Sequence, residues 1–148
     1  MAGKTKKAQV VIAAIDQESQ SFQFLLLQTN SKRGSFWQNV TGKIEADETF
    51  EEGGLREAIE ETNLNIEHII DIVDLEMRYE FIDLRKRDVV EESFLFIFDN
   101  KWEVKIDPHE HQDYKWVNID DINPESVKFE SNYEPLIKSR KLLKHWGK

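Results

Sequence analysis

The stretch that most constrains this chain is TGKIEADETFEEGGLREAIEETNL, residues 41–64, which is crowded with carboxylates. Glu57, Glu60 and Glu61 stand at relative positions 0, 3 and 4, so a helix places all three on one side. Like charges at this spacing repel one another. We therefore expect a helix whose acidic side is compensated by something other than its own residues.

Local signals define both ends of this helix. Thr49 and Glu52 have the spacing of a capping box, in which each side chain bonds the other residue's backbone. Asn63 tolerates the left-handed conformation that ends a helix. The pattern predicts a helix over residues 50–62. Its expected inner face consists of small and apolar side chains: Leu55, Ala58, Ile59 and Thr62.

Short apolar runs elsewhere predict strands, and one amphipathic run near the end of the sequence predicts a helix. Expected strands span residues 8–15, 22–28, 66–83, 92–99 and 114–119, with a loop over 29–39, a charged connection over 84–91 and a final helix over 134–146. In that helix we expect Leu136, Ile137, Leu142 and Leu143 to be buried. Strands with two helices at unequal spacing indicate an α/β (α+β) fold, a mixed sheet covered by helices.

Composition limits the classes of function. A length of 148 residues suits one domain, expected to span residues 1–148. We find no apolar run long enough to cross a membrane and no secretory signal. The absence of cysteine is compatible with the cytoplasm, and a net charge of −9 argues against a nucleic-acid binder. A polyphosphate ligand would therefore need a mediating cation.

Three converging carboxylates suit the hydrolysis of a phosphoanhydride. That reaction needs charge on phosphate oxygens neutralised and a water activated, and Mg²⁺ or Mn²⁺ held by oxygen ligands does both. Without a metal, mutual repulsion should raise at least one carboxyl pKa. The alternative is an ordinary solvated acidic face.

A longer pattern favours the metal site. Gly42 is followed after five residues by Glu48 and after seven more by REAIEETNL, residues 56–64. This resembles the Nudix box of the Nudix hydrolase family, with Asn63 where that family usually has glycine. The resemblance implies an α/β/α sandwich. It also implies a metal site with ligands from one carbonyl and three carboxylates: Gly42, Glu57, Glu60 and Glu61.

The same resemblance implies that Arg56 and Glu48 orient the carboxylates through ion pairs and, with Glu57, form the catalytic set. Outside the box, FWQNVTGKIE, HEHQDYKWV and ESNY are similar to bacterial dihydroneopterin triphosphate pyrophosphatases. This likeness implies Glu110 as a further metal ligand and Thr41 as a substrate contact. One departure is QTNSKRG, where those enzymes carry consecutive arginines.

Further substrate contacts are candidates with plainer alternatives. Trp37 offers a flat face for a purine or pterin ring, or is a core residue, while Gln38 offers a donor and an acceptor for the ring's edge. Lys7 could meet phosphate, although an exposed lysine is the usual case. His109 and His111 are expected at the surface, and neither is assigned to a metal.

Together these features predict a Mg²⁺- or Mn²⁺-dependent pyrophosphohydrolase. Its expected substrate is dihydroneopterin triphosphate or a nucleoside triphosphate, cleaved to a monophosphate and pyrophosphate, with no nucleic-acid or membrane partner. Two alternatives stay open, a diadenosine polyphosphate hydrolase and a catalytically silent binding module. The sequence does not determine which phosphorus atom is attacked, which residue is the general base, how many metal ions bind or what the oligomeric state is.

Overall fold

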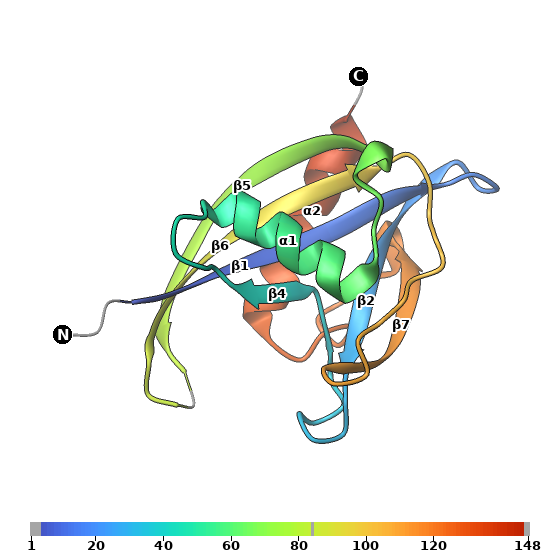
Figure 1. The fold of residues 1–148 in the computed structure, drawn as a ribbon. Coiled ribbons are helices and arrows are strands. Elements are labelled where there is room, and N and C mark those ends of the chain that lie inside the picture. Colours follow the sequence, from blue (N-terminus) through green and yellow to red (C-terminus); the bar gives the residue numbers. More distant parts are fainter. Residues whose placement is uncertain (1–3, 84, 147–148) are drawn as a thin grey trace.

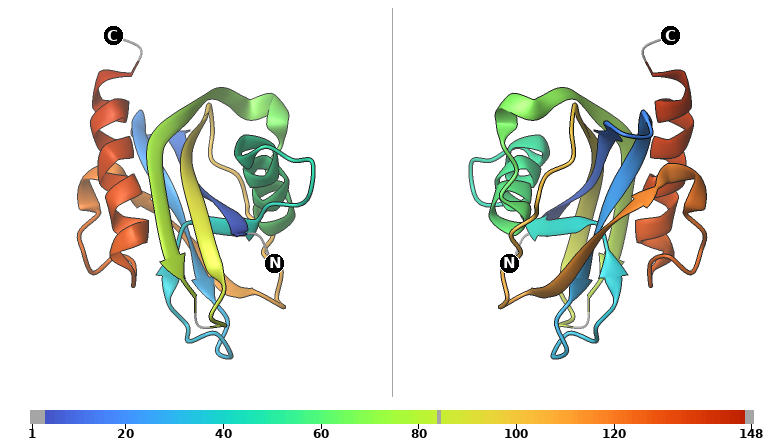
Figure 2. Two further views of the ribbon diagram at one scale, coloured as in Figure 1. Left: turned by 90° about the vertical axis from the view of Figure 1, so that its left-hand side faces the viewer. Right: turned by 90° about the vertical axis from the view of Figure 1, so that its right-hand side faces the viewer.

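A mixed β-sheet of seven strands lies between two α-helices in the computed structural model, which describes residues 4–83 and 85–146. Helix α1 covers one face and α2 the other, so the expected α/β/α sandwich is confirmed (Figures 1 and 2). The elements are β1 (Thr5–Asp16), β2 (Ser21–Thr29), β3 (Trp37–Gln38), β4 (Val40–Lys43), α1 (Phe50–Thr62), η1 (Ile66–His68), β5 (Ile69–Ile82), β6 (Asp88–Phe98), β7 (His111–Asn118), η2 (Ile119–Asp121) and α2 (Glu130–His145).

Strand β1 organises the sheet. Along one edge it pairs in parallel with β6, and along the other it pairs antiparallel first with β4 and then with β2. Beyond the residues that pair with β1, strand β2 pairs with β3. Along its other edge, β2 pairs with β7. This arrangement brings β4, which carries Gly42, and β7, which begins at His111, to the α1 side of the molecule.

The apolar run of β1 is continuous because this strand is buried on both faces. Val10 and Ile12 point into the core beneath α1, whereas Val11 and Ala13 point into the core beneath α2. The side chains of both sets are almost completely buried. The two helices therefore rest on opposite faces of one strand.

Several element boundaries differ from the expected ones. Helix α1 matches residues 50–62. The connection expected over 84–91 is wrong from Asp88 onward, because Val89 and Val90 are buried within β6; Leu84 lies outside the described residues. Strands β3 and β4 were not expected.

The helix faces also differ in part. Ala58 and Thr62 of α1 are buried as expected, but Ile59 is 40% exposed. In α2, which begins four residues earlier than expected, Leu136 and Leu143 are buried while Leu142 is 39% exposed. Among the described residues, no helix is both long enough and apolar enough to span a membrane.

We expect Leu136→Ala to lower the free energy of unfolding by about 2–5 kcal/mol, because the substitution leaves a cavity beneath α2. Leu142→Ala on the same helix is the matched control and should change stability by less than about 0.5 kcal/mol. Urea denaturation of both variants measures the difference. Equal losses would show that Leu136 does not anchor α2.

Candidate active site

Helix α1 presents the acidic side chains, and its two caps fix where it starts and stops. Thr49 Oγ1 accepts a hydrogen bond from the Glu52 backbone N–H at 3.1 Å, and a Glu52 carboxylate oxygen accepts one from the Thr49 N–H at 2.9 Å. Asn63 is left-handed, with φ 56° and ψ 34°. The predicted capping box and C-cap are both confirmed.

Gly42 of β4 lies directly beneath the Glu57 side chain. A Cβ atom at Gly42 would lie 2.5 Å from Glu57 Oε2 and closer still to Glu57 Cγ and Cδ. Only glycine leaves room for the carboxylate in this position. The strand and the helix therefore bring the Gly42 backbone and the Glu57 carboxylate together.

Arg56 links the acidic groups into one network. Its guanidinium donates to both Glu48 carboxylate oxygens, at 2.8 and 3.0 Å, and Nη1 donates to Glu57 Oε1 at 3.0 Å. Nη2 also donates to the Lys43 carbonyl at 2.9 Å. Glu60 lies at the edge, 3.4 Å from Nη1, with 59% of its side chain exposed. The geometry suits the orienting role expected of Arg56 for Glu48 and Glu57.

The network shifts pKa values in opposite directions. Hydrogen bonds from Arg56 hold the pKa of Glu48 below its usual range, and Glu48 in turn raises the pKa of Arg56. Burial raises the pKa of Glu57 in spite of Arg56. Glu57 is therefore only partly compensated by its arginine partner.

Glu61 carries the least compensated charge of the site. It is 2% exposed, and its Oε2 atom has no hydrogen-bond partner in the part of the chain that the structure describes. Burial raises its pKa well above the usual range, and repulsion from Glu110 and Glu57 adds to the effect. The expected rise in a carboxyl pKa is confirmed, but desolvation rather than mutual repulsion is the larger cause.

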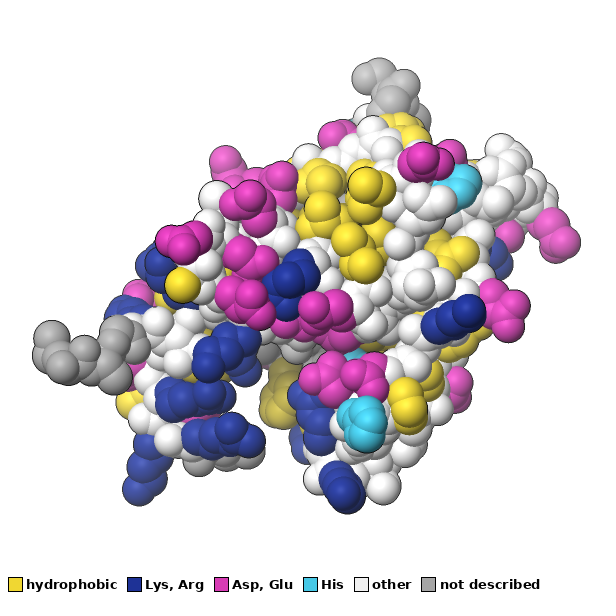
Figure 3. Space-filling view, in the orientation of Figure 1, with side chains coloured by type: hydrophobic (Ala, Val, Ile, Leu, Met, Phe, Trp, Pro, Cys, Tyr) yellow, Lys and Arg dark blue, Asp and Glu magenta, His cyan; other side chains and the backbone are white. Residues whose placement is uncertain are grey.

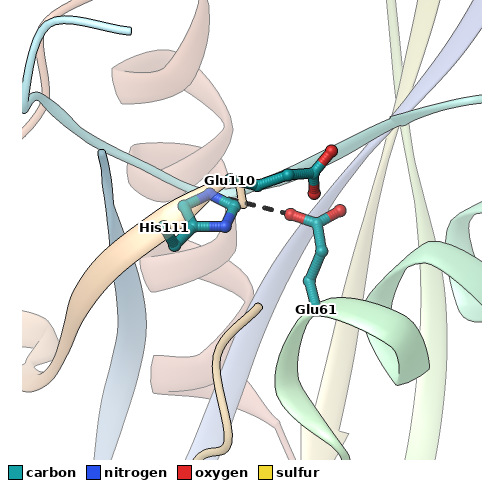
Figure 4. A group of neighbouring side chains, drawn as sticks. All are labelled: Glu61, Glu110 and His111. Atoms are coloured by element: carbon teal, nitrogen blue, oxygen red, sulfur yellow. Dashed lines mark ion pairs between the residues drawn. The ribbon is translucent and has the colours of Figure 1, made fainter. Parts of the chain in front are cut away.

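Glu110 and His111 approach Glu61 from the start of β7. One ligand atom from each of the three residues lies within 4.8 Å of the other two (Figure 4). Glu110 is exposed at the edge of this group, while His111 is fully buried. The expectation of a surface His111 was wrong, whereas His109 is exposed as expected.

His111 is uncharged at neutral pH, because burial lowers its pKa to about 4. Its Nε2 atom accepts a hydrogen bond from Gln38 Nε2 at 3.1 Å and lies 3.8 Å from Glu61 Oε1. A neutral imidazole cannot form an ion pair, so it leaves the Glu61 charge unbalanced.

The four expected substrate residues lie on two sides of the sheet. Gln38 faces the α1 side, where it meets His111, whereas the half-buried Trp37 packs on the α2 side with Lys115 Nζ 4.2 Å from its ring centroid. Thr41 pairs with Gln9 of β1, and Lys7 pairs with Lys43. Trp37 and Gln38 therefore do not form one continuous surface.

A β-bulge explains why sequence alternation missed His111. Trp116 and Tyr114 pack on the α1 face, and strict alternation would turn His111 to the opposite face. Thr29 pairs with His111 while Gln28 pairs with Asp113, so β7 holds one extra residue. The bulge returns His111 to the α1 face. No local sequence signal marks this shift.

The surface around these residues has two signs of charge. Acidic side chains gather over α1, and lysines and arginines gather below them on the same face, on both sides of a hollow (Figure 3). A cation at the acidic part would face a polyanion held by the basic part. The arrangement thus suits a ligand that carries several phosphates.

In the metal-free protein, we expect Glu61→Gln to raise stability near neutral pH. A carboxyl with a raised folded-state pKa binds its proton more tightly in the folded state, so its stabilising contribution is present at low pH and lost as pH rises through that pKa. Glutamine remains neutral throughout. Urea denaturation in chelator at several pH values should show an advantage for the variant that shrinks on acidification; an advantage independent of pH would contradict the shift.

The sequence model of the NUDIX domain family matches residues 5–138. An octanoyltransferase from Myxococcus xanthus is 31% identical over 113 residues, which make up 74% of this chain but 30% of that protein, so the chain spans less than a third of its length. A Caenorhabditis elegans Ap4A hydrolase has a TM-score of 0.77 at 22% identity, covering 96% of this chain and 99% of that chain. The Escherichia coli dihydroneopterin triphosphate pyrophosphohydrolase has a TM-score of 0.72 at 23% identity, covering 95% of each. These structural likenesses establish a shared fold.

Proposed function

Because the chain belongs to the NUDIX domain family, we propose that it is a Nudix hydrolase, a metal-dependent pyrophosphohydrolase of triphosphate substrates. It cleaves a phosphoanhydride of dihydroneopterin triphosphate or a nucleoside triphosphate to a monophosphate and pyrophosphate. The observation that carries the proposal is the Glu61 carboxylate, which is buried beside Glu57 and Glu110 and whose Oε2 atom has no hydrogen-bond partner among the described residues.

The donor set fits a hard divalent cation such as Mg²⁺ or Mn²⁺. The proposed ligands are the carboxylates of Glu57, Glu60, Glu61 and Glu110 with the carbonyl of Gly42. Glu61 Oε2 has no partner, and Gly42 leaves the space that Glu57 occupies. When bound, such a cation neutralises charge on phosphate oxygens and lowers the pKa of a bound water.

The protein's own residues prepare this site. Arg56 holds the Glu48 and Glu57 carboxylates in fixed directions through charge-assisted hydrogen bonds. The burial of Glu61 keeps bulk water away from one wall of the pocket, which strengthens electrostatic interactions there. Glu48, Arg56 and Glu57 thus form the proposed catalytic set, with Glu57 directed toward the substrate by its partners.

The proposed substrate contacts lie on both sides of the sheet. Gln38 reaches the pocket through His111, and Thr41 precedes Gly42 in β4. Lys7 stands at the same edge of β1 and could meet phosphate. Trp37 packs on the α2 side, so a stacked ring would lie on that side of the sheet. A substrate that uses both Trp37 and Gln38 must pass around the β3 edge.

A diadenosine polyphosphate hydrolase is the second candidate, favoured by the fold shared with the C. elegans enzyme. In the sequence, Tyr79 downstream of the Nudix box would favour this candidate. That hydroxyl donates a 2.6 Å hydrogen bond to Glu134 of α2, so the ring is tied to a helix rather than offered to an adenine. A silent binding module is disfavoured because the acidic set is intact.

A substrate panel tests the proposal. Dihydroneopterin triphosphate, the nucleoside triphosphates, Ap4A and ADP-ribose would be assayed with Mg²⁺ and with Mn²⁺, and products identified by chromatography. We expect the highest kcat/KM with a triphosphate and pyrophosphate among the products. Glu61→Gln protein prepared in parallel is the control for contaminating hydrolases. No hydrolysis of any compound by the native protein would overturn the proposal.

We also propose that residues 1–148 form a single domain and that the protein works in the cytoplasm. The family match covers most of the chain, and a chain without cysteine suits a reducing compartment. The partner in this proposal is a small phosphorylated molecule.

A further inference from the structure

His111 lies in the wall of the carboxylate pocket without a role in the reaction proposed above. Its ligand atom lies within 4.8 Å of those of Glu61 and Glu110 (Figure 4). Ligand atoms around an octahedral cation with bonds of about 2.1 Å lie up to about 4.2 Å apart. Only one pair among three ligands can stand at that distance, and neighbouring ligand atoms lie about 3.0 Å apart, so the three side chains would have to move together to hold one ion.

The hydrogen bonds of His111 do not support a purely structural role. Its Nδ1 atom has no hydrogen-bond partner among the described residues, so no such bond fixes the ring from that atom. The two polar groups near Nε2 both belong to the pocket, Gln38 at 3.1 Å and Glu61 at 3.8 Å. The imidazole is thus directed by the candidate site itself, not by the surrounding core.

A second unsatisfied atom lies in the same pocket. Glu61 Oε2 is buried and has no hydrogen-bond partner. It comes from α1, whereas His111 comes from β7, so two separate elements direct a carboxylate and an imidazole to one place. A cation between them would use the carboxylate and the imidazole together.

Gln38 keeps the imidazole ready for such a cation. Its Nε2 group donates to His111 Nε2, which therefore carries no proton and directs its lone pair to Gln38 in this structure. Rotation of the Gln38 carboxamide frees that lone pair. Gln38 precedes β4 and lies on the α1 side, so the rotation requires no change in the fold.

We propose that His111 Nε2 is a nitrogen ligand of the divalent cation held by Glu61 and Glu110, and that the site therefore prefers Mn²⁺ to Mg²⁺. This inference rests on the proposed function and specifies its metal. Imidazole suits transition metals, whereas Mg²⁺ is held by oxygen ligands. Three carboxylates without the imidazole would not make this distinction.

Pulsed electron paramagnetic resonance of the Mn²⁺-loaded full-length protein tests the proposal directly. We expect ¹⁴N modulation in the native protein that changes to a ¹⁵N signal after ¹⁵N-histidine labelling. His111→Gln should abolish it, and His109→Gln, the exposed neighbour, should keep it. Fully loaded native protein without nitrogen modulation would overturn the inference, and so would a signal that survives His111→Gln.

Calorimetry gives an independent measure. His111→Gln should raise the Kd for Mn²⁺ by at least about tenfold, since even residues behind metal ligands contribute that much, and should leave Mg²⁺ binding nearly unchanged. Because His111 is buried, the variant must first show a native circular dichroism spectrum. If the variant does not fold, the electron paramagnetic resonance spectrum of the native Mn²⁺ complex still decides the question.

The two proposals fail in different ways. If Mn²⁺ binds without nitrogen coupling and Glu61→Gln weakens that binding, His111 is not a ligand and the hydrolase proposal stands. If neither cation binds the native protein and hydrolysis continues in chelator, the metal-dependent function itself is wrong.

Discussion

Glu61→Gln is expected to lower kcat by at least about a hundredfold, because residues that merely support metal ligands already contribute up to about that factor. The substitution keeps the size and helix propensity of the side chain but removes an anionic ligand. Steady-state kinetics on the best substrate, across a range of Mg²⁺ concentrations, measures the loss. Excess metal should restore little of it, since the ligand itself is missing.

Glu51→Gln is the matched control for this result. Glu51 is an exposed glutamate in the first turn of the same helix, outside the acidic network. We expect near-native rates from it. If both variants hydrolyse substrate at the native rate, the acidic face of α1 is only solvated and the proposed function fails.

Gly42→Ala is expected to weaken metal binding by about tenfold or more, because displaced ligands lose affinity on that scale. The new methyl group would overlap the Glu57 side chain, which must then leave its place beside Arg56. The clash is with a flexible side chain rather than with backbone, so the protein should still fold. Calorimetric titration with Mn²⁺ measures the change.

A double-mutant cycle separates this steric effect from a general disturbance of β4. In the Glu57→Ala background no carboxylate remains for the Gly42 methyl group to displace. Gly42→Ala should then have almost no further effect on metal affinity, giving a strong coupling between the two positions. Additive losses would contradict the close packing of Gly42 against Glu57.

Helix α1 could be predicted from sequence because its signals are local. The capping box joins residues three apart, and the Asn63 cap depends on one residue's conformation. The same locality made the shared side of Glu57, Glu60 and Glu61 predictable. The exposure of Ile59 was not predicted. How much of the α1 surface is buried depends on which elements pack against the helix, and the sequence does not show this.

Strand β4 could not be predicted because its pairing is non-local. VTGK is too short to show alternation, and it becomes a strand only by pairing with residues 7–10 of β1. The actual requirement for glycine is the Glu57 side chain above it, which is a tertiary contact.

The site was predictable in its charged residues and less so in its buried ones. Arg56 contacts Glu48 and Glu57 as the resemblance implied, and Glu110 comes close to Glu61. The degree of burial of Glu61 and the inward turn of His111 depend on packing and on a bulge in β7. The catalytic and ligand roles of these residues remain predictions.

Hydrolysis of the best triphosphate with and without a chelator tests the central claim most directly. Phosphorus nuclear magnetic resonance would follow the products in real time. We expect no turnover in excess chelator, recovery on adding Mn²⁺ or Mg²⁺, and release of pyrophosphate, because an acidic pocket cannot by itself hold a polyanionic substrate. Undiminished turnover in excess chelator would contradict the account.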